Sequence, residues 1–156
     1  RRSNELLNGA YGTDFRYDEG TVISKGAKGF LGANAVGAGT MAFAGLAALP
    51  ITRPLLKKFL PKPGEGPTPE AIENGHYHIE LRGIHPTDPS KNMTAHVRGD
   101  KDPGYGSTSK MIVESALALA QDDLPVKGGF WTPASAMGDA LLSRLPASAG
   151  VTFEIE

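Results

Sequence analysis

The sequence predicts an α+β fold, with an antiparallel or mixed sheet of about four to five strands and helices packed on one face of it. Three observations support this fold class. Two segments alternate strictly between apolar and polar residues, which is the period of a half-buried strand. Two later segments begin with a capping residue and a proline and continue with apolar residues at helical spacing. A Pro/Gly-rich segment separates these parts from an apolar N-terminal region.

The composition fits one domain with its own core, or such a domain with an appendage. The chain has 156 residues, of which 40% are hydrophobic, and this excludes collagen, coiled coil and full disorder. It contains no cysteine, which excludes a disulfide scaffold, a cysteine nucleophile and a thiolate metal site. Residues 1–66 carry a charge of +4 (9 − 5) and residues 67–156 a charge of −5 (7 − 12). Neither half is basic enough to indicate nucleic acid as the main partner.

Residues 1–62 are predicted to contain one strand and a Gly/Ala-rich helical region. Thr13–Ile23 alternates aromatic with charged residues and ends in a β-branched run, which predicts the strand. Lys25–Leu49 is Gly/Ala-rich and mostly apolar, and predicts a close-packed helix. The mostly apolar stretch Ala33–Pro50 barely reaches the length of a membrane span and contains Asn34 and three glycines. We therefore expect no transmembrane helix.

A basic segment and a linker follow this region. Ile51–Lys62 has four positive charges and no negative one, and Pro54 and Pro61 bound a short helical turn within it. Its leucines and phenylalanine make it amphipathic, so it could rest on an anionic membrane surface or pack against a missing domain. We favour the second interpretation. Residues 63–69 form a Pro/Gly linker, which cannot hold a helix or a central strand.

Residues 70–156 are predicted to form the α+β domain proper. His76–Arg82 and Asn92–Arg98 alternate between apolar and polar residues and are joined by a polar loop, which predicts an antiparallel hairpin. Phe130–Trp131 could add a short strand, and Val151–Glu156 predicts the last one. The polar face of this sheet must meet water or another domain.

Two helices are expected between these strands. The first begins at Asp102–Pro103, where a carboxylate precedes a proline, and its apolar stripe continues to Asp122. The second begins at Thr132–Pro133 in the same way. Its expected buried face consists of Met137, Ala140, Leu141 and Leu145.

Three short motifs could carry chemistry, but a structural interpretation is favoured for each. Gly37–Ala42 matches the dinucleotide pattern G-x-G-x-x-A, yet no convincing strand precedes it and no acidic residue follows at the required distance. His76, His78 and His96 could converge on a metal, but solvated histidines are commoner. Ser107–Lys110 matches S-x-x-K without its partner motifs, which is typical of a polar helix start.

The candidate binding residues lie where the two helices begin. The corners at Asp102–Tyr105 and Trp131–Pro133 each offer free backbone N–H groups, which favour an anion. If the corners lie side by side, a carboxylate or phosphate could bind between them. Lys110 could face the same ligand, or it could form a surface ion pair with Glu114. The candidate substrate-binding residues are Gly104, Tyr105, Lys110 and Thr132, with no metal or cofactor ligand among them.

Several phrases of the sequence, in this order, together resemble a known family. They include Tyr11-Gly12, Pro63-Gly-Glu-Gly-Pro67, Asp102-Pro-Gly-Tyr105, Gly128-Gly-Phe-Trp-Thr-Pro133 and Gly138-Asp-Ala-Leu141. The chain resembles the C-terminal part of the saccharopine dehydrogenase-like NAD(P)-dependent oxidoreductases, which include bacterial trans-acting enoyl reductases. The resemblance covers essentially the whole chain.

This resemblance implies a longer parent whose N-terminal Rossmann domain binds NAD(P) and is absent here. The lack of cysteine fits a cytoplasmic location, with peripheral membrane contact as the alternative. The present region would complete the substrate cleft, contribute to a homodimer and be inactive alone, with no cofactor of its own. In the whole enzyme the reaction would be hydride transfer from nicotinamide to an amino-acid imine or a lipid enone. No catalytic residue can be assigned through the resemblance, and the corner geometry alone could explain Gly104, Tyr105, Thr132 and Pro133.

Two other functions stay open. The chain could be a non-catalytic module that dimerises through its sheet and contacts a membrane surface through residues 51–62. It could also be a free-standing ligand-binding domain, which requires Arg1 to be the natural start. Because the chain opens Arg1-Arg-Ser-Asn without a methionine, we expect a fragment of a longer protein.

Overall fold

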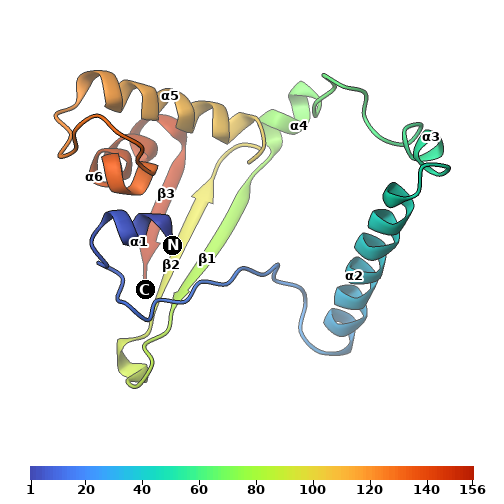
Figure 1. The fold of residues 1–156 in the computed structure, drawn as a ribbon, viewed down its shortest axis with the longest axis horizontal. Helices are drawn as coiled ribbons and strands as arrows, with labels where there is room; N and C mark the ends of the chain where they lie inside the picture. The colour runs from blue at the N-terminus through green and yellow to red at the C-terminus, as the bar shows by residue number, and fades with distance from the viewer. The chain divides into compact units, whose positions relative to one another are not determined.

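The computed structural model describes all 156 residues, and the chain divides into two units. The first unit consists of Arg1–Phe15 and Pro67–Glu156, and the second of Arg16–Gly66. The helices drawn in Figure 1 are α1 (Arg2–Leu6), α2 (Gly26–Ala48), α3 (Arg53–Leu56), α4 (Pro69–Asn74), α5 (Gly106–Gln121) and α6 (Pro133–Arg144). A 3-10 turn η1 (Pro89–Lys91), a π-helical turn η2 (Leu145–Ala149) and the strands β1 (Tyr77–Gly83), β2 (Met93–Gly99) and β3 (Val151–Ile155) complete the chain.

The sheet of the first unit has three antiparallel strands in the order β1-β2-β3. The predicted hairpin and the predicted last strand are confirmed. In β1, apolar Ile79 lies opposite Val97 of β2, and Val97 lies opposite Phe153 of β3, so the apolar alternation of all three strands falls on one face.

The prediction of four to five strands is wrong. Thr13–Ile23 has no regular structure, because its alternating pattern has no neighbouring strand to pair with and a lone extended segment is not stable. Phe130–Trp131 lies in a loop instead of a strand. The Trp131 indole N–H donates to the Lys127 carbonyl at 2.8 Å and closes that loop.

The core of the first unit has two parts, one between the sheet and α5 and η2, and one between α5 and α6. Val151 of β3 is 1% exposed and packs with Leu145 and Ala149 of η2. Val97 and Met111 complete this cluster, so α5 and η2 cover part of the apolar sheet face. A second cluster joins α5 to α6 through Ala118, Ala136 and Met137. In Figure 1, α5 and α6 lie together at one end of the sheet.

The two predicted helices of this unit are confirmed, with one shifted start. The Thr132 hydroxyl caps α6, and the Ser135 hydroxyl accepts the Thr132 N–H in return. Helix α5 begins later than expected, at Gly106. The Asp102 carboxylate accepts the Tyr105 N–H at 2.7 Å, so it closes a turn in front of the helix and does not cap the helix itself.

Helices α1 and α4 are not among the predicted elements. Helix α4 begins at Pro69, the last residue of the expected linker, and Thr68 caps it by accepting the Ala71 N–H. Proline at a first helical position is favourable, whereas proline inside a helix is not. The same residue therefore ends the linker and starts a helix.

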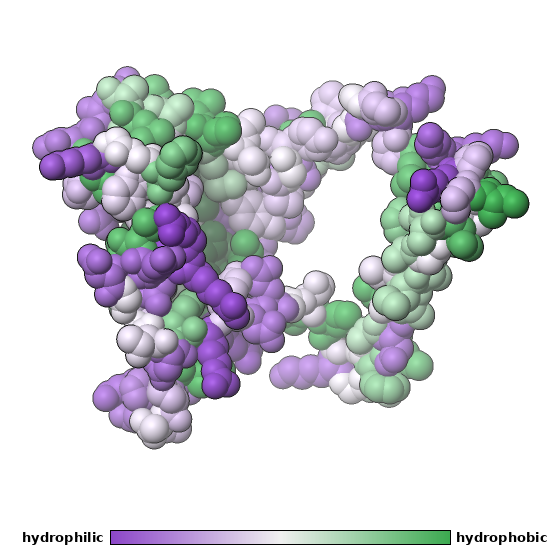
Figure 2. All heavy atoms as spheres, viewed as in Figure 1, coloured by the Kyte–Doolittle hydropathy of each residue, from purple (hydrophilic) through white to green (hydrophobic).

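The second unit contains α2 and α3. Helix α2 confirms the predicted Gly/Ala-rich helix, but its close packing is not found, because only Gly29 is buried. Helix α2 is the one helix of the structure that is long and apolar enough to cross a membrane by length and composition. The stretch Ala33–Pro50 considered in the sequence begins inside this helix and so falls short of its full length. Figure 2 shows α2 as mainly apolar in colour along its length.

Candidate functional site

The corner in front of α5 is held by hydrogen bonds of Asp102. Its backbone N–H donates to the Ile72 carbonyl at 3.1 Å, and its carbonyl accepts the Ser107 N–H at 2.8 Å. A Cβ on Gly104 would lie 3.4 Å from the Asp102 carboxylate, which is an ordinary contact. The Tyr105 side chain is 57% exposed. This corner therefore presents Tyr105 to solvent without a forced close approach at Gly104.

Lys110 lies on the first turns of α5 and pairs with a strand end. Its Nζ is 3.6 Å from an Asp100 carboxylate oxygen. The alternative pairing with Glu114 is wrong, because Glu114 forms an ion pair with Arg144 of α6 at 3.2 Å. Asp100, directly after β2, is therefore the partner of Lys110 in this structure.

The Thr132 hydroxyl forms its hydrogen bonds within the protein. The Oγ1 atom lies 2.9 Å from the Ser135 hydroxyl and 2.9 Å from the hydroxyl of Ser3 in α1. The contact with Ser135 belongs to the cap of α6, and the contact with Ser3 joins α1 to that cap. The geometry therefore gives Thr132 a structural task at the position where the sequence suggests a binding task.

The structure does not bring the two corners together. Thr132 lines a pocket with Leu119 and Asp122, at the C-terminal end of α5. Tyr105 immediately precedes α5 at its N-terminal end. Since α5 has 16 residues, its ends are about 24 Å apart. A single anion site between the corners is therefore not formed, because Thr132 is separated from Gly104 and Tyr105 by the length of α5.

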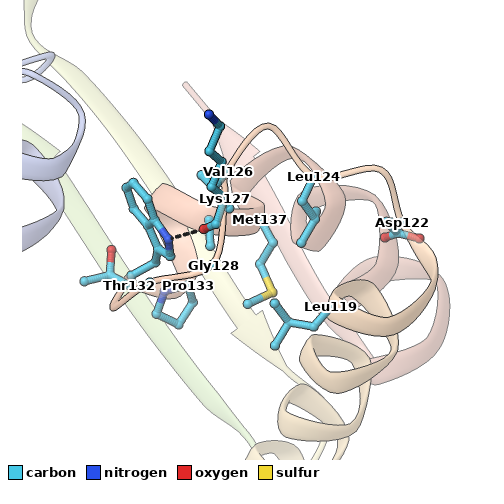
Figure 3. Close-up of a pocket in the computed structure, with 12 residues that line it drawn as sticks. Leu119, Asp122, Leu124, Val126, Lys127, Gly128, Thr132, Pro133 and Met137 are labelled. Carbon is cyan, nitrogen blue, oxygen red and sulfur yellow. Dashed lines mark hydrogen bonds between the residues drawn. The ribbon is translucent and has the colours of Figure 1, made fainter.

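The pocket at the C-terminal end of α5 has a volume of about 470 Å³ and is drawn in Figure 3. Its lining consists of Leu119, Asp122, Leu124, Val126, Lys127, Gly128, Gly129, Trp131, Thr132, Pro133, Ala136 and Met137. Leucine, methionine and tryptophan side chains supply the apolar wall, and Lys127 and Asp122 are the charged members. Its volume falls within the range of small-molecule sites. The sequence feature that points to this pocket is the Gly128–Pro133 segment. Only its last three residues, Trp131–Pro133, belonged to the predicted anion-binding corner.

The polar face of the sheet carries a network of charged and imidazole side chains. His78 Nε2 and His96 Nδ1 lie 2.9 Å apart, and His96 Nε2 is 3.5 Å from a Glu156 carboxylate oxygen. His76 precedes β1 and takes no part in this contact. No group of three or more metal-ligating side chains is formed, so the histidines do not converge as a metal site would require.

Two carboxylates of this face are stabilised in their ionised form. The hydrogen bond from Arg82 holds the pKa of Glu80 below its usual range, and the hydrogen bond from Arg98 does the same for the pKa of Glu154. Both pairs are largely exposed, so each contributes little to stability. Only the Arg98–Glu154 pair joins two strands, β2 and β3.

The remaining motifs do not form catalytic or cofactor sites. Gly37–Ala42 lies in the interior of α2, whereas a dinucleotide pyrophosphate needs a helix N-terminus directly after a strand. The Gly37–Ala42 motif therefore does not fit the pyrophosphate of NAD(P). Ser107 of the S-x-x-K match is fully buried, and its hydroxyl lies 3.1 Å from that of Tyr77, so it is not available as a nucleophile.

The chain is similar to curated proteins of mycobacteria. It is 44% identical over 163 residues, 99% of the chain, to a Mycobacterium tuberculosis protein provisionally named a trans-acting enoyl reductase. It is 40% identical over 158 residues, 98% of the chain, to the trans-acting enoyl reductase of Mycobacterium bovis. The corresponding protein of Mycobacterium ulcerans is 40% identical over 154 residues, 94% of the chain.

These alignments cover only part of the relatives. The chain spans 37% of the length of the M. tuberculosis and M. bovis proteins and 35% of the M. ulcerans protein. No protein-family model and no solved structure matches the chain.

Proposed function

We propose that this chain is the C-terminal substrate-binding and assembly region of a longer NAD(P)-dependent enoyl reductase of the saccharopine dehydrogenase-like type. The observation that carries the proposal is the identity of 40–44% to mycobacterial proteins named as trans-acting enoyl reductases, over 94–99% of this chain. In this proposal the longer protein is cytoplasmic and transfers a hydride to an unsaturated substrate.

The roles that we assign to this chain and to the rest of the longer protein follow from the binding sites that this chain has and does not have. Gly37–Ala42 cannot seat a dinucleotide, so the nicotinamide chemistry belongs to the part of the protein outside this chain. The chain offers the pocket that Trp131 helps to line, and the cationic side chain of Lys110 in α5, the helix that Tyr105 precedes. We assign the pocket to the apolar part of a substrate, and the Gly104–Tyr105–Lys110 group to an anionic part.

The test is an activity assay on the longer protein that contains this chain, with crotonyl-CoA as the probe and NADH or NADPH consumption followed by absorbance. Lys110→Ala should raise KM by roughly 10-fold or more, because a charge-assisted hydrogen bond is lost. Tyr105→Phe should raise KM less. Lys91→Ala, at an exposed lysine of η1 that pairs with Asp88, is the matched control and should leave kcat and KM unchanged.

Unchanged kinetics in both Lys110→Ala and Tyr105→Phe would refute the substrate role of this corner. The second candidate function, a non-catalytic assembly module, would then account for the chain. One observation favours that alternative independently: apolar residues on the open part of the sheet face are 38–71% exposed. These residues are Ile79, Leu81, Met93, Phe153 and Ile155.

A further inference from the structure

The second unit combines a long uncharged run with strong exposure. Residues 29–52 contain no Asp, Glu, Lys or Arg, and most of this run belongs to α2. Fourteen of the 23 residues of α2 are Gly or Ala. Its larger apolar side chains are Phe30, Leu31, Val36, Met41, Phe43 and Leu46, which are 43–75% exposed. Because they point to all sides of the helix, no single face could be buried against a protein core while the rest stays in water.

The polar groups of this helix are satisfied within it. The Asn34 amide donates to the Phe30 carbonyl at 2.7 Å, and the Thr40 hydroxyl donates to the Val36 carbonyl at 2.9 Å. These are the only polar side chains in the uncharged part of α2. A helix in lipid must satisfy its polar groups internally, because no water is available to do so.

The C-terminal end of α2 is closed in the same way. The Thr52 hydroxyl donates to the carbonyls of Leu46 and Leu49. The Arg53 guanidinium donates to the carbonyls of Ala47 and Ala48. Two side chains therefore cover the last carbonyls of the helix, which otherwise need water.

Only positive charges flank the helix. Residues 20–64 contain six cationic side chains and no carboxylate: Lys25, Lys28, Arg53, Lys57, Lys58 and Lys62. Apolar Ile51, Leu55 and Phe59 stand among the last four of these and are 58–87% exposed. This charge pattern complements an anionic lipid surface. It opposes pairing of α2 with a second copy, because such a pair would gather cations without any anions.

The chain connection excludes a simple crossing of the bilayer. Arg1–Phe15 and Pro67–Glu156 belong to one compact unit, in which Ser3 contacts Thr132. If α2 crossed a membrane once, these two parts would lie on opposite sides and could not pack together. A return crossing by residues 49–66 would carry four cations through the hydrocarbon, which is costly.

We propose that residues 16–66 are a monotopic membrane anchor, in which α2 embeds in one leaflet of an anionic bilayer and the flanking lysines and arginine contact the lipid headgroups. The anchor enters and leaves the bilayer on the same side. This inference is independent of the proposed enzymatic function. It also extends the predicted surface contact of residues 51–62 to an embedded helix.

The first experiment is flotation of the 156-residue chain with vesicles of phosphatidylcholine and phosphatidylglycerol at 3:1, compared with phosphatidylcholine alone. The chain should float with the anionic vesicles. The double variant Lys57→Gln/Lys58→Gln should weaken its partitioning by roughly 30-fold. Lys91→Gln/Lys127→Gln, in the first unit, is the control with the same charge change and should float like the parent. Absence of the chain from both floated fractions overturns the proposal.

A second variant tests the apolar helix itself. Val36→Glu places a charge in the middle of α2 at a side chain that is 63% exposed, so the fold of the isolated protein is not affected. It should abolish flotation. Ile112→Glu alters a side chain of α5 that is 66% exposed and should float normally. Flotation of Val36→Glu at the parent level would show that α2 does not embed. If the parent chain binds no vesicles and Val36→Glu abolishes its self-association, α2 contacts a second copy instead of a membrane.

Because the chain contains no cysteine, single introduced thiols can show on which side of the bilayer each end of the anchor lies. Thr21→Cys and Glu65→Cys place single thiols on either side of α2 and α3. A membrane-impermeant maleimide added outside intact vesicles should label both variants fully. Protection of either thiol until detergent is added would mean that the segment crosses the bilayer, and would overturn the monotopic arrangement.

Discussion

Gly104, just before α5, and Gly106, the first residue of α5, differ in how much space surrounds them. A Cβ on Gly106 would lie 2.8 Å from Lys101 Cβ and 3.2 Å from the Ile72 carbonyl oxygen. A Cβ on Gly104, two residues earlier, would meet only the Asp102 carboxylate at an ordinary distance. The close approach of backbones at this corner therefore depends on Gly106, which no sequence motif singled out.

This contrast predicts effects of different size on stability for two similar substitutions. Gly106→Ala should lower the free energy of unfolding by about 1–3 kcal/mol, because α5 and the Ile72 backbone must move apart. Gly104→Ala should change it by no more than about 0.5 kcal/mol. Urea unfolding monitored by circular dichroism measures both. Equal stability of the two variants would contradict this account of the corner.

At the scale of elements, Arg144 joins the two helices of the first unit. Its guanidinium donates to both Asp122 oxygens at 2.6 and 2.8 Å and to Glu114 at 3.2 Å. The hydrogen bonds from Arg144 hold the pKa of Asp122 below its usual range. Asp122 directly follows α5 and Arg144 ends α6, so this cluster fixes the packing of one helix on the other.

The lowered pKa of Asp122 predicts a pH dependence of stability. A carboxyl group whose pKa is lower in the folded state contributes stability above its unfolded pKa of about 3.9. That contribution is lost as the pH falls through the folded value. The urea midpoint should therefore drop as the pH falls below about 4, and Arg144→Gln should be less stable at pH 7 with a flatter acid profile. Arg2→Gln, which breaks an exposed pair with Glu5, is the control and should keep the parent profile. An unchanged acid profile in Arg144→Gln would refute the cluster's role.

The sequence was sufficient to predict elements with strong local signals. The hairpin strands and α6 each carry a period and a cap that tertiary contacts reinforce, and both were found. Thr13–Ile23 has the same alternation but no partner strand, and pairing is a property of the whole sheet. Helix α4 has only six residues, which is too short for a periodic pattern to indicate it.

At the scale of the whole molecule, the candidate site depends on how the helices are arranged in space, which the local sequence patterns do not predict. Two helix starts of similar chemistry are close neighbours only if their helices run in parallel, and sequence does not fix that direction. Here the start of α6 lies by the end of α5, so Thr132 is far from Lys110. The pocket beside Trp131 depends on Leu119 and Met137 from different helices, and no local pattern connects them.

The open apolar face of the sheet leads to a prediction about assembly. Its groove of about 450 Å³ is lined by Tyr77, Ile79, Val97, Pro103, Met111, Leu145, Val151 and Phe153. A contiguous exposed apolar surface of this kind usually marks an interface. We expect the chain to self-associate through this face in detergent-free buffer, or to bind there the remainder of the longer protein.

Ile79→Lys should weaken this self-association by roughly 100-fold or more, because a charge would be buried without a partner. Sedimentation velocity across a concentration series measures the change. Ile112→Lys, on the exposed face of α5, introduces the same charge outside the groove and should sediment like the parent. If Val36→Glu, and not Ile79→Lys, produces the monomer, then α2 and not the sheet holds the copies together. That result would also count against the membrane anchor, since one helix surface cannot serve both contacts at once.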